Sequence, residues 1–213
     1  MKQFRQVLMV FIGTAMVATR MQAAPEFDSS VSQTTQIWQG IIGEGFQSSA
    51  QTLSLEAGGT VGFQALGGEQ NHDLALVSLS YGHMLDGPVG KDHWYVGNWE
   101  LRGELFGGQQ FSPSDNWLVG LTPHLRYDLA TGTRCVPFID GGAGVSATGI
   151  GPPDLSGTFE FNIQGNLGAH WFFRDNLALT LETGYLHVSC AGIHYPNQGL
   201  NCVTVKAGLT CFF

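Results

Sequence analysis

The feature that most restricts the fold is an alternation of apolar and polar residues, clearest over residues 159–173. Its odd positions are apolar, with aromatic residues at both ends: Phe159, Phe161, Ile163, Gly165, Leu167, Ala169, Trp171 and Phe173. The even positions are polar almost throughout: Glu160, Asn162, Gln164, Asn166, Gly168, His170 and Phe172. Because successive side chains of a strand point to opposite faces, this period of two predicts a β-strand with one apolar and one polar face.

Eight segments share this pattern, and each reaches the ~9–11 residues that a membrane-spanning strand needs. They cover residues 52–65, 72–85, 94–106, 116–129, 136–148, 158–173, 176–189 and 201–213. Residues typical of turns, such as Gly67-Gly68 and Asp175-Asn176, separate them. Short connections join antiparallel strands. We therefore predict an all-β fold over residues 51–213, an eight-stranded antiparallel up-and-down barrel.

Composition indicates where such a barrel resides. Charged residues make up 12% of the chain, whereas soluble surfaces carry about 25–35%. No long apolar run follows the N-terminus, which excludes a helical membrane protein. The parity of the residue numbers, odd for one face and even for the other, does not by itself distinguish a membrane barrel from a soluble barrel with an apolar interior. However, aromatic residues stand at both ends of the apolar faces: Trp117 and Tyr127 in one segment, and Phe159 and Trp171 in another. This placement is typical of the aromatic girdles at membrane interfaces. We expect the apolar face to contact lipid in an outer membrane.

The polar face then lines the barrel interior. It carries charged residues of both signs, for example Glu56, Arg102, Arg126, Glu182 and Lys206. An eight-stranded barrel is narrow enough for side chains to fill it. We therefore expect a polar plug and keep a narrow pore as the less favoured alternative.

The N-terminus has the three-part layout of a secretory signal peptide: a basic start, an apolar run over residues 7–18 and the small residues Ala23 and Ala24. A run of 12 residues is short of the about 20 that a transmembrane helix needs. We predict a signal peptide over residues 1–23 and a periplasmic segment over 24–50. Removal of the signal peptide leaves 6 of the 9 basic residues against 17 acidic ones, so the formal charge of the mature chain is 6 − 17 = −11. Such an acidic chain argues against a nucleic-acid partner.

Two polar residues interrupt the apolar face of the seventh segment. His187 and Ser189 share the parity of Leu179 and Leu181, and their Cα atoms are expected to lie roughly 6–7 Å apart. Asn201 has outward parity in the eighth segment, and a hairpin turning near residues 195–196 places it opposite Ser189. A hydroxyl, an imidazole and an amide match a nucleophile, a base and an orienting group. Alternatively, they are interfacial polar residues without a function.

The residues around this trio form a longer motif: residues 187–193 read His-Val-Ser-Cys-Ala-Gly-Ile and residues 196–199 read Pro-Asn-Gln-Gly. This motif resembles that of the lipid A 3-O-deacylase family of outer-membrane barrels. The family pattern is His-x-Ser-Asn-Ala-Gly followed by Pro-Asn-x-Gly. Residues 123–127, 137–144 and 159–162 are also similar to it. The resemblance implies removal of an ester-linked acyl chain from lipid A or lipopolysaccharide, with Ser189 as nucleophile and His187 as base.

Two positions depart from the family pattern. Cys190 replaces an asparagine linked to the oxyanion hole, and Asn201 stands where the family usually has a glutamate. By the resemblance, the backbone N–H groups of Cys190, Ala191 and Gly192 are the candidate oxyanion donors. A non-catalytic barrel, such as an adhesin or a membrane-stabilising protein, is the alternative function.

The remaining residues with chemical potential leave some questions open. The cysteines are Cys135, Cys190, Cys202 and Cys211. Cys190 and Cys202 share even parity beside the last loop, and they are expected either to form a disulfide or to stay as free, buried thiols. The seven histidines lack metal-ligand spacing, and no Gly-x-Ser-x-Gly elbow or phosphate loop occurs, so we predict no metal and no cofactor. The sequence leaves homo-oligomerisation open.

Overall fold

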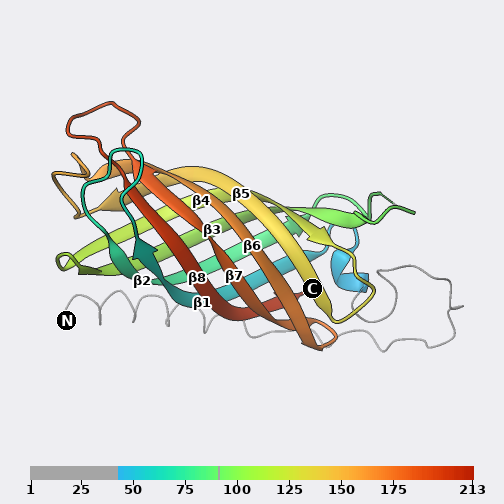
Figure 1. The fold of residues 1–213 in the computed structure, drawn as a ribbon. Coiled ribbons are helices and arrows are strands. Elements are labelled where there is room, and N and C mark those ends of the chain that lie inside the picture. Colours follow the sequence, from blue (N-terminus) through green and yellow to red (C-terminus); the bar gives the residue numbers. More distant parts are fainter. Residues whose placement is uncertain (1–42, 91) are drawn as a thin grey trace, which may run out of the picture. The chain divides into compact units, whose positions relative to one another are not determined.

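Eight antiparallel strands close into one barrel in the computed structural model, which describes residues 43–90 and 92–213 (Figure 1). The strands are β1 (Gln51–Gly62), β2 (Asp73–Met84), β3 (Gly97–Ser112), β4 (Asn116–Leu129), β5 (Cys135–Thr148), β6 (Phe159–Arg174), β7 (Leu177–Ser189) and β8 (Leu200–Phe212). Each strand pairs with its neighbours in chain order, and β1 pairs with β8 to complete the ring. The predicted eight-stranded up-and-down barrel is confirmed.

The third strand departs most from the prediction. It was expected over residues 94–106, yet β3 begins at Gly97 and runs on to Ser112. Trp94 instead lies in the connection before it and is 89% exposed. The extension includes Gly107 and Gly108, which pair with β4 although they have no side chain to show the alternation. The backbone ladder continues through them because its hydrogen bonds do not depend on side chains.

Part of the N-terminal prediction lies outside the described residues, namely the signal peptide over 1–23 and the first part of the segment over 24–50. From residue 43 onward, this segment forms a short 3₁₀ helix, η1 (Gly43–Phe46). Phe46 is fully buried and packs against Phe172 and Phe212, at the end of the barrel where the C-terminus lies (Figure 1). None of the helices among the described residues is long and apolar enough to cross a membrane.

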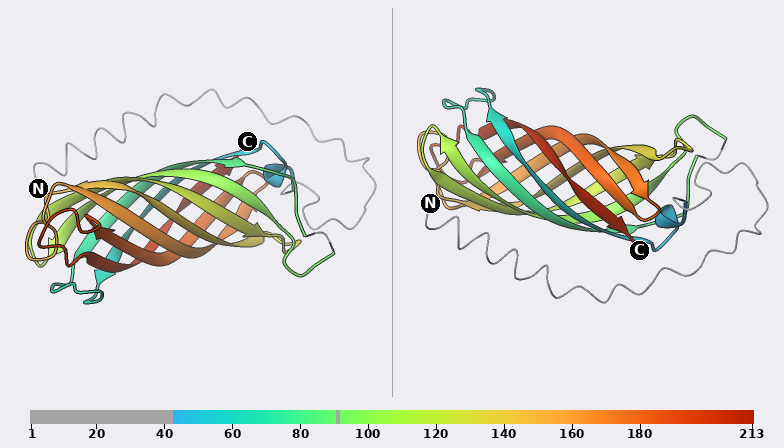
Figure 2. Two further views of the ribbon diagram at one scale, coloured as in Figure 1. Left: turned by 90° about the horizontal axis from the view of Figure 1, so that it is seen from above. Right: turned by 90° about the horizontal axis from the view of Figure 1, so that it is seen from below.

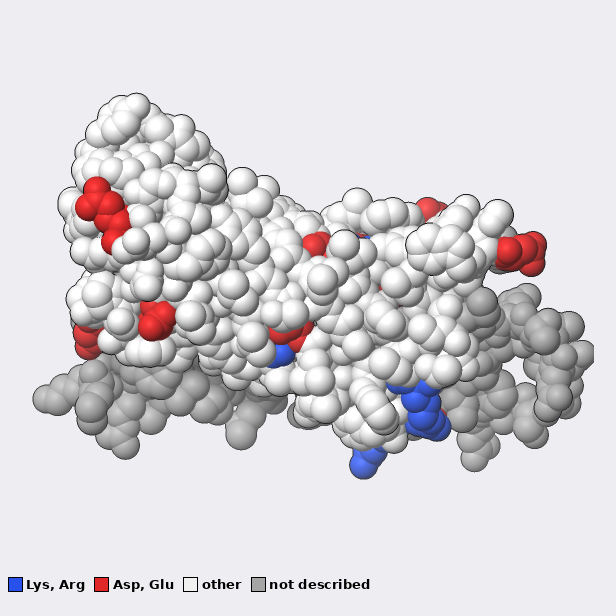
Figure 3. Space-filling view, viewed as in Figure 1, with Lys and Arg blue, Asp and Glu red and all other residues white. Residues whose placement is uncertain are grey.

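The two faces of the wall follow the predicted parity. Odd positions of β6 point outward, and Leu167, in the middle of the strand, is 58% exposed. The aromatic residues Phe159 and Trp171 are also exposed, toward the two ends of that strand. The face seen in Figure 3 carries few charged side chains between the two ends of the barrel. The lipid-facing assignment of the apolar face is thus consistent with the fold.

The even positions bury a network of ion pairs. Arg102 Nη2 lies 2.8 Å from Glu56 Oε2, and Arg126 Nη2 lies 2.7 Å from Asp140 Oδ2. Lys206 Nζ lies 2.8 Å from an oxygen of Glu182, a residue that Arg126 also contacts. These side chains are almost completely buried. The interior is therefore filled by paired charges, as predicted for a polar plug.

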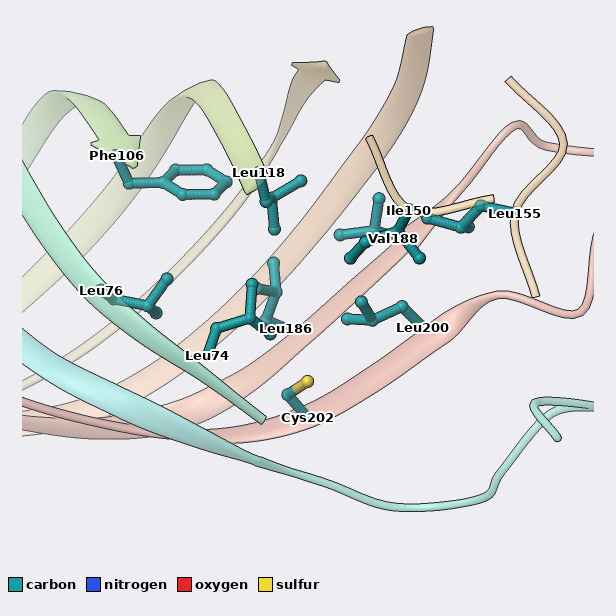
Figure 4. Close-up of a cluster of buried hydrophobic side chains, with 10 residues drawn as sticks. All are labelled: Leu74, Leu76, Phe106, Leu118, Ile150, Leu155, Leu186, Val188, Leu200 and Cys202. Atoms are coloured by element: carbon teal, nitrogen blue, oxygen red, sulfur yellow. The ribbon is translucent and has the colours of Figure 1, made fainter. Parts of the chain in front are cut away.

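Apolar residues close this interior at each end, which the alternation did not predict. One group lies at the end of the barrel where β7 meets β8, next to the candidate residues His187 and Ser189, and is called the apolar cluster under the site. It contains Leu74, Leu76, Phe106, Leu118, Ile150, Leu155, Leu186, Val188, Leu200 and Cys202 (Figure 4). The opposite end holds Phe46, Met84, Val96, Ala130, Val136, Phe172, Ala178 and Phe212. Buried apolar packing at the strand ends gives the β7–β8 hairpin a rigid support.

Candidate active site

The candidate site lies where β7 ends and β8 begins. Ser189 is the last residue of β7, and the connection over residues 190–199 leads to Leu200 at the start of β8. The connections β1–β2, β3–β4 and β5–β6 lie at the same end of the barrel, away from η1 and the C-terminus (Figures 1 and 2). Val188 and Leu200, which flank the site, point into the apolar cluster under it.

Ser189, His187 and Asn201 meet on the outer wall as a chain of hydrogen bonds. His187 Nε2 lies 3.0 Å from Ser189 Oγ, and His187 Nδ1 lies 2.9 Å from Asn201 Oδ1. His187 and Ser189 are half-buried, whereas Asn201 is only 2% exposed. The three side chains predicted to meet therefore do so.

The predicted register of this hairpin is wrong by two residues. Asn201 pairs with His187 and not with Ser189. The cause is a tight turn directly after Ser189, in which Ile193 N donates to Cys190 O over 3.1 Å. This turn moves the centre of the connection toward the N-terminal side of residues 195–196. Since a shift of two residues keeps every side chain on its face, Asn201 still lies on the same face as His187.

The contacts of Asn201 determine the tautomer of His187. Asn201 Nδ2 donates to the carbonyl oxygen of Ala65 over 2.8 Å, which directs Oδ1 of the same amide toward His187. Oδ1 can only accept, so His187 Nδ1 carries the proton. His187 Nε2 then has a free lone pair facing the hydroxyl of Ser189. This is the tautomer that a general base needs.

Tyr185 is also part of this arrangement, although the sequence analysis did not single it out. Its hydroxyl donates to Asn201 Oδ1, so that oxygen accepts two hydrogen bonds. The rings of Tyr185 and His187 are nearly parallel, at 18°, with their centroids 6.4 Å apart. The shared odd parity of residues 185, 187 and 201 was the signal that could have identified Tyr185.

The candidate oxyanion donors are not equivalent. The N–H of Cys190 already donates to Asn197 Oδ1 over 3.0 Å, so it is not available as predicted. Ala191 and Gly192 are exposed and adopt positive φ values of 53° and 80°. They form the corner of the tight turn next to Ser189. The Gly192 N–H is directed toward the Cys190 thiol, so the Ala191 N–H is the candidate that remains.

Gly199 and Cys190 illustrate how the loop is fitted around the site. A Cβ atom at Gly199, whose φ is 81°, would lie 2.8 Å from His187 Cε1, so only glycine leaves room for the imidazole. The Cys190 side chain is buried and donates to the carbonyl oxygen of His194 over 3.3 Å. Cys202 contacts the carbonyl oxygen of His72 instead. The four cysteines are free, so of the two expectations for Cys190 and Cys202, the disulfide is wrong.

One group of carboxylates has the spacing of a metal site. Glu56, Glu104 and Glu182 gather inside the barrel. However, the ammonium group of Lys206 contacts both Glu104 and Glu182, and Arg102 pairs with Glu56. Protein cations thus already neutralise these carboxylates, which lie inside the barrel, whereas Ser189 lies on the outer wall.

Comparison with known proteins places this geometry in a family. The model of the family described as lipid A 3-O-deacylase (PagL) matches residues 75–210. The crystal structure of the outer membrane enzyme PagL superposes with a TM-score of 0.56 at 17% identity, over 74% of this chain and 97% of that chain. That of Neisserial surface protein A (NspA) gives 0.54 at 14% identity, over 78% and 98%. No curated protein matches the sequence.

The structural matches are too distant in sequence to show more than the fold, a closed eight-stranded β-barrel. The family match carries further, because it covers well over half of the chain and includes His187, Ser189 and Asn201. The chain belongs to the lipid A 3-O-deacylase family of outer-membrane β-barrels.

Proposed function

We propose that the protein is an outer-membrane hydrolase that removes an ester-linked acyl chain from lipid A, with Ser189 as nucleophile and His187 as general base. The observation that carries this proposal is the hydrogen-bonded chain from Ser189 through His187 to Asn201. Family membership supports the substrate class.

The reaction follows from the tautomer of His187. As Ser189 Oγ attacks the ester carbonyl, its proton moves to His187 Nε2. The N–H group of Ala191 stabilises the oxyanion of the tetrahedral intermediate. The imidazolium then protonates the leaving alkoxide of the sugar. A water molecule, deprotonated by His187, attacks the acyl-enzyme and releases the fatty acid.

The position of the site on the outer wall suits an ester inside a membrane. Ser189 ends a strand whose outward residues below it, such as Leu179 and Leu181, are apolar and exposed. An acyl chain attached near the headgroup can lie along this wall while its ester reaches Ser189. Water from the headgroup region can reach the acyl-enzyme. The lipid then does not need to leave the bilayer.

An amide at position 201, in place of an acid, lowers the expected rate of the reaction. It holds the imidazole in the productive tautomer but supplies no negative charge to stabilise the imidazolium. In a serine protease, changing the orienting aspartate to asparagine lowers kcat by about 10⁴-fold, chiefly because the histidine then adopts the wrong tautomer, so the loss of charge alone should cost less. We therefore expect slow turnover.

The test is release of fatty acid from purified lipid A in detergent micelles, measured by mass spectrometry. Wild type should release fatty acid, whereas Ser189→Ala and His187→Ala should not. Ser114→Ala is the matched control, because Ser114 is an exposed serine at the same end of the barrel in the β3–β4 connection. Heat-modifiable gel mobility establishes that each variant is folded.

The effects of the two active-site substitutions should not add in the double variant, because nucleophile and base act as a unit. Equal release by wild type and Ser189→Ala would refute the proposal. So would an inactive wild type under conditions where an active family member works. Either result would favour a non-catalytic barrel.

A further inference from the structure

Asp154, in the β5–β6 connection, is a buried acid at the site end of the barrel, with 0% of its surface exposed. Its Oδ1 accepts a hydrogen bond from the Glu69 N–H over 2.7 Å. Its Oδ2 accepts from the Gln70 N–H over 3.0 Å and lies 2.7 Å from His72 Nε2. The carboxylate thus holds the β1–β2 connection, residues 63–72, by three contacts.

The backbone of the same residue holds a second loop. The Asp154 carbonyl oxygen accepts hydrogen bonds from Gln198 N over 3.0 Å and from Gly199 N over 2.9 Å. One residue therefore joins the β1–β2 and β7–β8 connections, which are 190 − 72 = 118 residues apart in the chain at their nearest ends. The two loops also touch directly, since a Cβ atom at Gly68 would lie 2.9 Å from Gly199 O.

Each of the two loops contacts the catalytic hydrogen-bond chain. In the β1–β2 connection, Ala65 O accepts the hydrogen bond that orients the Asn201 amide. In the β7–β8 connection, Gly199 packs against the His187 imidazole. Asp154 touches neither Asn201 nor His187, so its influence on them passes through the loops.

We propose that Asp154 is a positioning residue, which sets the orientation of Asn201 and His187 by clamping the two loops that contact them. This inference rests on the proposed function. The expected effect is on the chemical step. If the β1–β2 connection moves, Asn201 loses the partner that keeps its Oδ1 toward His187 Nδ1. A misplacement of about 1 Å in a catalytic group can lower the rate about 10²-fold.

The substitution Asp154→Asn tests the clamp with little change in shape. It keeps the backbone carbonyl that holds Gln198 and Gly199 but replaces one carboxylate oxygen by an NH₂ group. That group cannot accept from an N–H donor, so one of the contacts to the β1–β2 connection is lost. Asp115→Asn is the matched control, because Asp115 is an exposed acid at the same end, bonded to the Gln109 side chain.

The decisive experiment is a double-mutant cycle with Asn201→Ala, read as kcat for fatty-acid release from lipid A. In the wild-type background, Asp154→Asn should lower kcat about 10- to 100-fold, with heat-modifiable mobility retained and Asp115→Asn near wild type. In the Asn201→Ala background, the same substitution should have much less effect, because Asn201 is no longer there to be oriented.

Three outcomes overturn the inference. Wild-type kcat in Asp154→Asn would show that the clamp does not matter to the chemistry. An equal fold-loss in both backgrounds would show a general structural effect that does not act through Asn201. An inactive wild type would refute the proposed function and this inference with it, whereas the first two outcomes leave the proposed function intact.

Discussion

Asn201 lies directly across the β7–β8 ladder from His187, with its Oδ1 2.9 Å from His187 Nδ1. By family resemblance, this is the position of an acid. The amide still presents an oxygen to the imidazole, because Ala65 O fixes its orientation and Tyr185 donates to the same Oδ1. What the amide lacks is charge. The site thus combines an intact arrangement with a weaker electrostatic contribution to the imidazolium.

Substitution of Asn201 separates orientation from charge. Asn201→Ala should lower kcat less than Ser189→Ala, because it removes orientation and leaves nucleophile and base in place. Asn201→Glu should raise kcat by about tenfold or more, because it adds a negative charge that stabilises the imidazolium. The measurement is initial rate on lipid A in micelles. A kcat for Asn201→Glu below that of Asn201→Ala would contradict the assigned role.

Gly199→Ala should displace the His187 ring. The added Cβ would lie 2.8 Å from His187 Cε1, and a shift of the ring by about 1 Å can lower kcat about 10²-fold. Gly132→Ala is the control, because Gly132 also has a positive φ, 69°, but lies in the β4–β5 turn at the opposite end. Both variants carry similar backbone strain, of roughly 1 kcal/mol. Equal activities in the two variants would argue against a close approach of Gly199 to His187.

The fold could be predicted because its information is local. Period-two alternation identifies strands and faces without knowledge of which strands pair, as in β6, where every outward residue named from parity proved to be outward. Alternation failed where side chains are missing, at Gly107 and Gly108, and at strand ends. There, inward residues such as Leu186 and Val188 are apolar because they pack in a cluster with apolar residues from other strands and from the β5–β6 connection.

The site was predictable only in part, for a related reason. His187 and Ser189 lie on one strand, so spacing alone placed them together. The partner of Asn201 depended on how the β7–β8 loop turns, and the turn at Ala191 and Gly192 was not identified from the sequence. Asp154 gave no signal at all. Its role comes from contacts to two loops that are distant in sequence.

The lipid face can be tested by placing a charge at two depths of one strand. Leu167→Arg, at the middle of β6, should lower the free energy of unfolding by about 2–4 kcal/mol. At Phe173, near the end of the strand, the charge introduced by Phe173→Arg should lower it by only about 0–1 kcal/mol. Both residues are outward and exposed. Urea unfolding from lipid vesicles measures the difference. Equal losses at the two depths would indicate that this face does not contact the bilayer core.

The last prediction concerns which end of the barrel faces outward. An even number of strands returns the chain to the side on which it started, so the connections next to Ser189 should lie outside the cell if both termini are periplasmic.

Gly151 and Gly87 form a matched pair for cysteine labelling, because a Cβ at either position meets nothing within 4 Å. Gly151 lies in the β5–β6 connection at the site end, and Gly87 in the β2–β3 connection at the opposite end. A polyethylene-glycol maleimide too large for porins should modify Gly151→Cys in intact cells, and Gly87→Cys only after the outer membrane is permeabilised. Wild type, with its four native thiols, gives the background. The reverse pattern would place Ser189 at the periplasmic surface, where it could not reach lipid A in the outer leaflet, and would refute the topology and the proposed substrate together.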